Sequence, residues 1–422
     1  MPSYRIPPQG EQTSLGIVKE VTPGVFPTMV GAVYHRATNV KLDGKNVPVP
    51  RTGAAKKWGQ ELPGTGGYES TLAIDVESAG DKIGQLIAFS LGAQTTPSTA
   101  IVNLALSAST LVAATTFPVG SSLPLNVVPG MTVTIDTSTN METLVLANPA
   151  VTSSAGVFSL NTTAGATKAH ASAVAVTVTG TAAYYSKMTL GSLPSFSAQI
   201  FRVTDTVDAL GCMMESMAIT MNAKGGLDFK FNAANLNEAI DASPASPAFS
   251  SKFPFEFENP KNWQVLGGNM VGVPGSSAAV ISLSAQINNN LDKTYFSGSS
   301  GRKPYAFVQQ IRSIKGTLTM GFEDDSAYEL FLGAAAATSP VFPVAGTSFA
   351  WVCAGQDIID STTGVPFLLT LQFPNIYPTS DPVDIKSTGV ITQQFGFDAS
   401  ESSNGSNDDL AVHYVGTNNA VF

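Results

Sequence analysis

Charged residues, histidine and cysteine are all scarce in this sequence of 422 residues. Asp, Glu, Lys and Arg make up 13% of the chain, about half of the ~25% that is usual in soluble domains. The only two cysteines, Cys212 and Cys353, lie far apart and form no Cys-x-x-Cys spacing. These features argue against a disulfide framework or a zinc cluster, and we expect two buried free thiols.

Basic residues are in the minority, with 22 Lys and Arg against 31 Asp and Glu and a formal net charge of −9. Because phosphate binding needs clustered Lys and Arg, this balance argues against a chain that grips nucleic acid. The N-terminus shows no apolar signal-peptide region. The longest weakly polar stretch, residues 100–117, is interrupted by Asn, Ser and Thr and predicts two strands. We therefore expect no membrane segment and synthesis in a cytoplasm.

Nothing in the sequence points to catalysis. His35, His170 and His413 lie in unrelated settings without a metal-binding spacing, and no phosphate-binding Gly-x-x-x-x-Gly-Lys-Ser/Thr loop is present. The acidic run Glu323-Asp324-Asp325 could bind a cation, but acidic residues also favour the N-terminus of a helix. We predict no enzyme, no catalytic residue, no cofactor-binding residue and no metal site.

Strand patterns dominate what is present. Alternation of apolar and polar residues predicts strands over 70–77, 131–136, 227–231 and 280–287. Two short helices are predicted, at 81–90 and 326–332, and both run into Leu-Gly-Ala, where Gly suits a helix end. At about 100–200 residues per domain, the length predicts two to four domains of a mainly β protein.

The same order of elements occurs twice. Each copy reads as strand, acidic turn, short helix and Leu-Gly-Ala, although chance similarity between generic strands is the alternative explanation. The matches are Thr71-Leu72 and Glu77 with Thr317-Leu318 and Glu323, Leu91-Gly92-Ala93 with Leu332-Gly333-Ala334, Phe196–Ile200 with Phe367–Leu371, and Gly211, Met213, Met217 and Ile219 with Gly389, Ile391, Phe395 and Phe397.

An additional segment, residues 94–180, interrupts the first copy. Asp136, Glu142 and Lys168 are its only charged residues, and successive strands are predicted at 130–135, 142–146, 157–160 and 170–176. We therefore predict a small β-domain inserted at a surface loop. The expected domains are a first unit at 1–93 and 181–240, the inserted domain at 94–180, and a second unit at 248–422, after a Ser/Pro-rich linker.

Ten of the 22 basic residues fall in two long segments that we predict to be equivalent loops, Asn39–Gly67 and Asn288–Gly316. They are either solvated or dock onto an acidic surface of another copy, and both explanations remain open. The residues predicted to make such contacts are Lys45, Arg51, Lys56, Lys57, Arg302 and Lys303, with Glu323, Asp324 and Asp325 as acidic partners on the other copy.

The sequence resembles the major tail tube proteins of long, non-contractile-tailed bacteriophages over roughly residues 10–95 and 181–422. The resemblance rests on a pattern of elements and has no single diagnostic motif. It is carried by the repeated strand–turn–helix unit, by Asn288-Asn289-Asn290-Leu291, by the strand Gly316–Phe322, and by the closing pair Pro366–Leu371 and Gly389–Phe395.

The resemblance implies two tandem tail-tube β-sandwich or barrel units, each with one short helix, plus the inserted β-domain. It also implies a structural virion protein, made in the bacterial host cytoplasm, that forms stacked rings around a channel for DNA during ejection. Since rings of the family have six such units, a two-unit chain should form trimers. The implied partners are other copies of the chain, the tape-measure protein, and tail terminator or distal tail proteins, while DNA passes without specific binding.

Two other classes of function compete. A decoration or adhesin-type protein on the capsid or tail surface could be built from similar β-domains. A secreted β-sandwich hydrolase is disfavoured because no paired catalytic residues and no signal peptide are visible.

Overall fold

The protein is described here from a computed structural model. It is mainly β, as predicted, with 27 strands and two helices among the residues that the structure describes. Those residues are 14–29, 31–49, 64–95, 100–120, 127, 129–154, 157–179, 185–201, 206–222, 225–241, 247–256, 263–266, 269–271, 280–294, 302–321, 326–332, 338–340, 347–360, 365–380, 383–384, 391–400 and 409–416.

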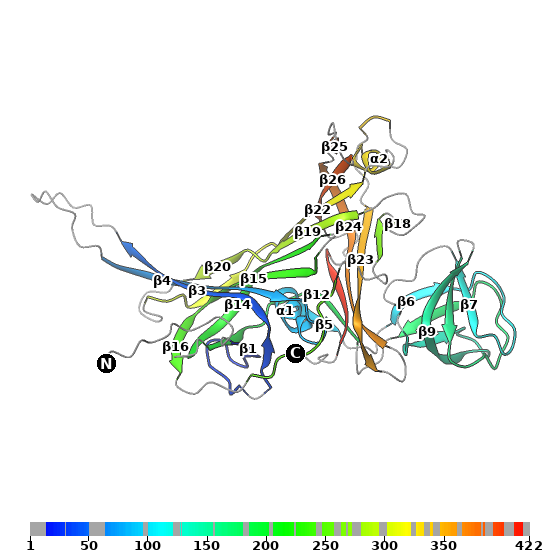
Figure 1. Cartoon of the computed structure of the whole chain (residues 1–422), viewed down its shortest axis with the longest axis horizontal. Helices are drawn as coiled ribbons and strands as arrows, with labels where there is room; N and C mark the ends of the chain where they lie inside the picture. Colours follow the sequence, from blue (N-terminus) through cyan, green and yellow to red (C-terminus); the bar gives the residue numbers. More distant parts are fainter. Residues whose placement is uncertain are drawn as a thin grey trace, which may run out of the picture.

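Strands from both halves of the chain join one large antiparallel sheet (Figure 1). From the first half come β1 (Ser14–Lys19), β2 (Val33–His35), β3 (Ala37–Val49), β4 (Gly64–Glu77), β5 (Gly92–Thr95), β12 (Tyr185–Leu190), β13 (Phe196–Phe201), β14 (Thr206–Asn222), β15 (Leu227–Asn235) and β16 (Asn237–Asp241). From the second half come β17 (Trp263–Leu266), β18 (Asn269–Val271), β19 (Val280–Asn288), β22 (Ser313–Gly321), β23 (Thr347–Asp360), β24 (Val365–Ser380), β25 (Val383–Asp384), β26 (Thr392–Ala399) and β27 (Ala411–Val415). A separate hairpin pairs β20 (Leu291–Thr294) with β21 (Ala306–Gln309).

The central part of the sheet consists of two consecutive four-stranded sets. Pairing runs β3-β4-β15-β14 in the first half and β19-β22-β26-β24 in the second. Strand β14 then pairs with β19, which joins the two sets edge to edge.

Three irregularities of register recur at corresponding places in the two sets. The β3–β4 ladder shifts between Ala37 and Asn39, and the β19–β22 ladder shifts between Val280 and Ser282. The other two matched shifts are in β13–β14 at Phe196/Ala198 and β23–β24 at Thr347/Phe349, and in β14–β15 at Met214/Ser216 and β24–β26 at Pro378/Ser380. Because each bulge fixes the local register of its strand, these coincidences align the two sets residue by residue.

At one pair of matching positions, the two sets carry the large side chain on different strands. Leu72 faces Ala233 in the first set, and Gly316 faces Phe397 at the matching place in the second. A Cβ atom on Gly316 would overlap the ring of Phe397. The large side chain therefore lies on β4 in the first set and on β26 in the second. This alignment pairs Ile74 with Leu318, which corrects the sequence match of Leu72 with Leu318 by two residues. The matched bulges also make β13 the counterpart of β23 and β14 the counterpart of β24. The sequence matches of Phe196–Ile200 with Phe367–Leu371, and of Gly211–Ile219 with Gly389–Phe397, are therefore wrong.

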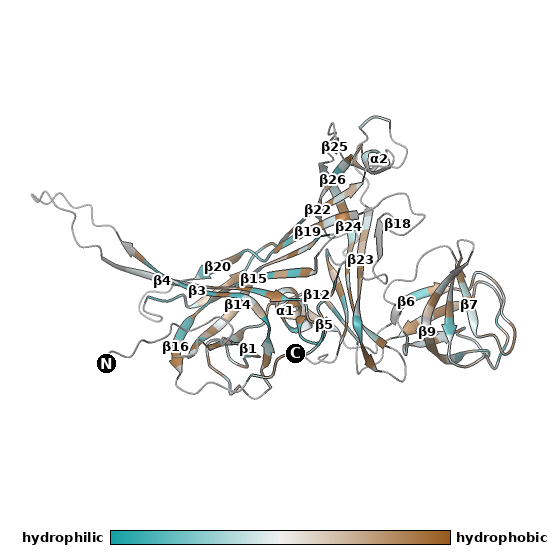
Figure 2. Ribbon diagram, in the orientation of Figure 1, coloured by the Kyte–Doolittle hydropathy of each residue, from teal (hydrophilic) through white to brown (hydrophobic). Residues whose placement is uncertain are grey.

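Helix α1 (Ile83–Leu91) is buried along its whole length against this sheet. It ends at Gly92, whose φ of 96° is left-handed and whose N–H donates to the carbonyl of Ala88. Apolar and polar residues alternate along the strands (Figure 2), and one buried cluster contains side chains of α1 and of both sets. The second predicted helix is confirmed as α2 (Ser326–Leu332).

A six-stranded antiparallel sheet forms from the segment between β5 and β12, and it lies at the opposite end of the molecule from the β3–β4 hairpin (Figure 1). Its strands are β6 (Ala100–Ala105), β7 (Thr116–Gly120), β8 (Thr132–Ile135), β9 (Glu142–Ser154), β10 (Val157–Thr162) and β11 (Ala175–Thr179). The buried cluster that holds its core also includes Tyr185, Val352, Leu368 and Val415 of the large sheet.

Two sequence predictions are wrong. The described parts of the segments Asn39–Gly67 and Asn288–Gly316 are mostly strands and not loops, because β3 pairs with β4 and β20 pairs with β21. Residues 170–174 are not part of a strand, since β11 begins at Ala175. The Gly, Pro and Lys residues of these segments favoured loops. The segments also contain β-branched residues and alternation, which are typical of strands.

The different placement of the large side chain in the two sets gives a stability prediction. Gly316→Leu should lower the free energy of unfolding by about 1–3 kcal/mol through overpacking, and Phe397→Ala by about 3–5 kcal/mol through a cavity. The double variant recreates the Leu72–Ala233 arrangement, so it should lose clearly less than the sum of the two single losses. Urea denaturation of the four proteins measures this coupling. Strictly additive losses would show that the two sites are not structurally equivalent.

Candidate assembly interface

The ladder between β14 and β19 joins the two halves of the chain. Residues 216–222 pair with residues 282–288 in one regular antiparallel register. On the core side, Met217 faces Ile287 and Met221 faces Leu283, and all four side chains are fully buried. The joint is therefore built like the interior of a sheet and not like a contact between loosely linked domains.

Hydrogen bonds from Asn289 stabilise the end of this ladder. Its fully buried side-chain amide donates to the carbonyl of Ser90 at 3.1 Å and to that of Met214 at 2.9 Å. Its backbone N–H donates to the carbonyl of Glu215 at 2.8 Å. One residue of the second half thus satisfies carbonyl groups at the end of α1 and at the bulge of β14.

In the second half of the chain, residues in and next to the β20–β21 hairpin contact the β3–β4 hairpin of the first half. Arg302 donates from Nε to the carbonyl of Gly66 and from Nη2 to Oδ1 of Asn46, both at 2.8 Å. The carbonyl of Arg302 accepts the N–H of Tyr68 at 2.6 Å. Lys293 forms an ion pair with Glu69 at 3.3 Å. Polar groups hold these two hairpins together.

A second ladder crosses between the halves at β12 and β27. The ring of His413 lies there, with Nδ1 at 2.5 Å from the hydroxyl of Tyr185 and Nε2 at 3.0 Å from Oε1 of Gln372. Burial, reinforced by the charge of Lys187, lowers the pKa of His413 to about 3. The histidine is therefore neutral at pH 7 and serves as a hydrogen-bonding link between the halves.

Three strand edges have no ladder partner among the described residues. Strand β3 pairs only with β4, β16 pairs only with β14, and β24 beyond Ile376, together with β25, pairs only with β26. Ile240 on β16 is 81% exposed. Exposed edges of this kind are templates for pairing with another chain.

The basic residues singled out from the sequence are only partly described. Lys45 lies on β3 with an exposed side chain, opposite Glu69 in the ladder. Arg302 contacts the β3–β4 hairpin, and Lys303 contacts Asn237 of β16, so both meet the first half of the same chain. Arg51, Lys56, Lys57, Glu323, Asp324 and Asp325 lie outside the described residues. Contact of these residues with a neighbouring ring stays a prediction.

Sequence reasoning missed the residues that join the two halves. Asn289 belongs to the Asn288-Asn289-Asn290 run that carried part of the family resemblance, which was the one available signal. Arg312, which donates to the carbonyl of Gly191, was counted only as a loop cation. His413 was noted only as a histidine without a metal-binding spacing, and its partners Tyr185 and Gln372 lie far from it in sequence.

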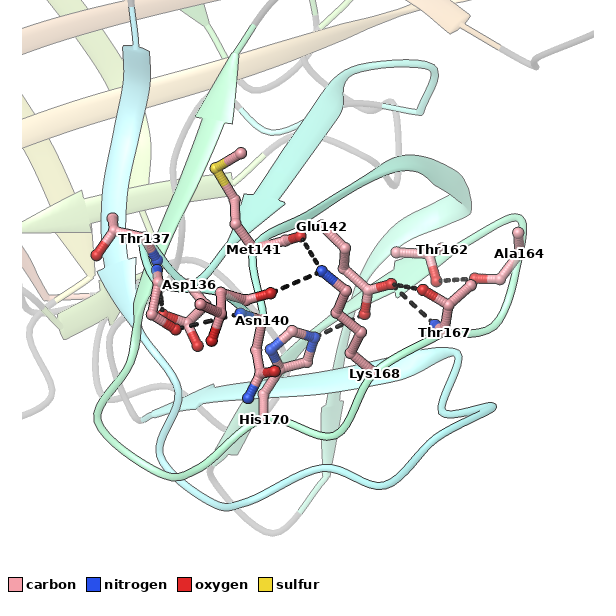
Figure 3. Close-up of polar contacts among 12 residues, drawn as sticks. Asp136, Thr137, Asn140, Met141, Glu142, Thr162, Ala164, Thr167, Lys168 and His170 are labelled. Carbon is pink, nitrogen blue, oxygen red and sulfur yellow. Dashed lines mark hydrogen bonds and ion pairs between the residues drawn. The ribbon is translucent and has the colours of Figure 1, made fainter.

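The most concentrated polar network is in the six-stranded sheet (Figure 3). Nε2 of His170 lies 2.6 Å from Oε1 of Glu142, and both side chains are buried. Oε2 of Glu142 accepts the N–H and the hydroxyl of Thr167 at 2.8 and 2.9 Å. Burial opposes ionisation of Glu142, but the hydrogen bonds from His170 and Thr167 outweigh it and lower the pKa of the carboxyl. Lys168 donates to two backbone carbonyls at 2.9 Å, and the network holds the β8–β9 hairpin against the loop before β11.

Other features bear on function class. In the described parts of the chain, no group of three or more His, Cys, Asp or Glu residues could hold a metal ion. Both cysteines are free and buried, as predicted, and burial raises the pKa of each thiol. None of the helices within the described ranges is long and apolar enough to cross a membrane.

Comparison with known protein families gives a match over most of the chain. The sequence model of the phage tail tube protein family fits residues 10–399. That range takes in both four-stranded sets and the six-stranded sheet between them. No curated protein matches the chain.

Protonation of His413 gives a prediction for acid stability. The pKa of His413 is about 3 in the folded chain and near 6.5 when unfolded. As the pH falls below about 6.5, His413 binds a proton in the unfolded chain but not in the folded chain. The folded chain therefore loses stability on acidification. Between pH 7 and pH 5 this group should cost about 2 kcal/mol. Urea titrations of wild type and His413→Gln measure it, and equal pH dependence of the two proteins would contradict it.

Proposed function

Because this chain belongs to the phage tail tube protein family, we propose that it forms the tail tube of a long, non-contractile-tailed phage, as stacked rings that leave a channel for DNA during ejection. The observation that supports this assembly is the edge-to-edge joint of the two four-stranded sets, which leaves matching edges at both ends without a ladder partner among the described residues. Pairing of those ends between copies closes a ring and removes the exposed edges.

We propose that the two sets, with their helices, are duplicated tube units and that three chains form one ring. The matched bulges and the recurrent pairing order support the duplication. With six units in a ring, as the resemblance to tube proteins implies, three chains supply them all. The ring then has true threefold and approximate sixfold symmetry.

DNA passes through this channel without being bound specifically. The net charge of −9 supports this role, because an acidic protein repels the phosphate backbone that it must release. The partners in this proposal are further copies of the chain, the tape-measure protein, and terminator or distal tail proteins at the tube ends. The proposed location is the tail of the virion, after synthesis in the bacterial host cytoplasm.

The six-stranded sheet is proposed to be a domain displayed on the outside of the tube. Its position beyond β23, away from β3 and β4, supports this placement (Figure 1). A decoration or adhesin-type protein is the alternative function, and it would also display such a domain. The long unpaired edges of β3 and β24 favour the tube, because a decoration protein has no need of them.

Imaging tests the proposal directly. Purified protein viewed by electron microscopy should show rings or hollow tubes, and mass measurement of single rings should give three chains per ring. The reason is that each chain supplies two tube units. Rings of six chains would contradict the duplication, and a protein that stays monomeric at high concentration would contradict the tube.

Deletion of the inserted segment tests its place outside the wall. Replacing residues 96–180 by a short Gly/Ser linker should leave ring formation intact, since no strand of the two four-stranded sets is removed. The melting temperature should fall, because Val352 and Leu368 lose apolar neighbours in the shared cluster. A folded deletion variant that forms no rings would place the segment in the wall.

A further inference from the structure

The two unpaired ends of the central sheet match the two strands that are already joined within the chain. The bulge at Met214/Ser216 of β14 corresponds to the bulge at Pro378/Ser380 of β24, so Ser380 is the counterpart of Ser216. Strand β25 continues the β24 ladder on β26, with Val383 opposite Gln393 and Asp384 opposite Thr392. Strands β24 and β25 together therefore reproduce the course of β14.

Strand β3 is the counterpart of β19 by the same reasoning. The bulge at Ala37/Asn39 corresponds to the bulge at Val280/Ser282. Lys45 lies as far along β3 from Ala37 as Asn288 lies along β19 from Val280. Asn288 pairs with Ser216 in the joint within the chain. The corresponding partner of Lys45 is therefore Ser380.

Burial along β3 indicates a missing neighbour. Leu283 and Ala285 of β19 are fully buried, whereas their counterparts Val40 and Leu42 on β3 are only partly buried. Asn289 is fully buried with both its amide hydrogen bonds made to the first half. Its counterpart Asn46 is exposed, although its Oδ1 accepts a bond from Arg302. The β3 edge thus has the residues of a joint, and no strand in the described parts of the chain covers them.

We infer that β3 of one copy pairs antiparallel with the β24–β25 edge of a second copy in the register of the β14–β19 ladder. Lys45 then faces Ser380, Leu42 faces Val383, and Lys41 faces Asp384. This inference rests on the proposed ring and specifies the surface and register of its contact. The alternative partner for this edge is a strand of a different tail protein. Cross-linking and assembly of the purified chain distinguish the two.

The chemistry of the two edges is complementary in this register. Lys41 has a side chain that is 66% exposed and is held near Asp43 at 3.2 Å. Placing Asp384 opposite Lys41 brings unlike charges together across the ladder, where they stabilise pairing and oppose a slip. Leu42 gains cover from the second copy as Ala285 does from β14 within the chain. A slip of one residue would turn these side chains to the wrong face.

Disulfide trapping tests the register. Directly opposed residues of an antiparallel ladder have Cα atoms about 4.5–5.5 Å apart, which suits a disulfide. The variant Lys45→Cys/Ser380→Cys should oxidise in assembled rings to covalent species of up to three chains on a non-reducing gel. The matched control Asp43→Cys/Ser380→Cys has the same face but a diagonal spacing of about 7–8 Å, and it should cross-link at least about tenfold less. Cys212 and Cys353 are fully buried and add no background.

The outcomes separate this inference from the proposed function. Preferential cross-linking of Lys45→Cys/Ser380→Cys between copies supports the inference, with melting temperature and circular dichroism checking that both variants fold. Rings that cross-link equally in the control, or in neither variant, overturn the register while the tube function stands. A wild-type chain that forms no rings, or that assembles only when another tail protein is added, overturns this pairing of copies together with the homotrimeric ring.

Discussion

Backbone N–H and C=O groups along a strand edge need hydrogen-bond partners, and the rest of this structure depends on how that need is met. The long sheet satisfies it internally at the β14–β19 ladder, where two four-stranded sets become one. Among the residues that the structure describes, it leaves the same need unmet at β3 and at the β24–β25 edge. A sheet that adds equivalent sets loses its open edges only when it closes on itself, which supports the proposed ring.

Side-chain hydrogen bonds strengthen the β14–β19 joint beyond the backbone hydrogen bonds of its ladder. Asn289 fixes the end of α1 to the bulge of β14, Arg302 holds the two hairpins side by side, and His413 links β12 to β24. These contacts set the angle between the two sets before any second copy arrives. A preformed angle lowers the entropic cost of closing the ring, because fewer joints remain to be ordered on assembly.

Much of the architecture could be predicted from the sequence, and the limits have physical causes. Alternation located β4, β15 and β19, and the Leu-Gly-Ala endings located both helices, because local periodicity reports burial directly. The order of elements was recognised, but its register was off by two residues at Leu318, and β13 and β14 were matched with the wrong strands of the second half, since bulges insert residues that no periodicity reveals. The β3–β4 hairpin was predicted to be a loop, because its strands carry Lys and Gly, and edge strands often carry charged residues in place of apolar ones. Asn289 and His413 act through neighbours distant in sequence, so nothing local marks them.

The central claim is that the free edges of β3 and β24 become paired when copies assemble. Amide hydrogen exchange measured on the dissociated subunit and on the assembled form tests it most directly, residue by residue. Amides of residues 41–45 on β3 and of Ser380, Val383 and Asp384 should become strongly protected on assembly, while residues 282–288 of β19 should be protected in both forms. Equal exchange of β3 amides in the two forms would contradict the account, because it would show that this edge stays open in the assembled protein.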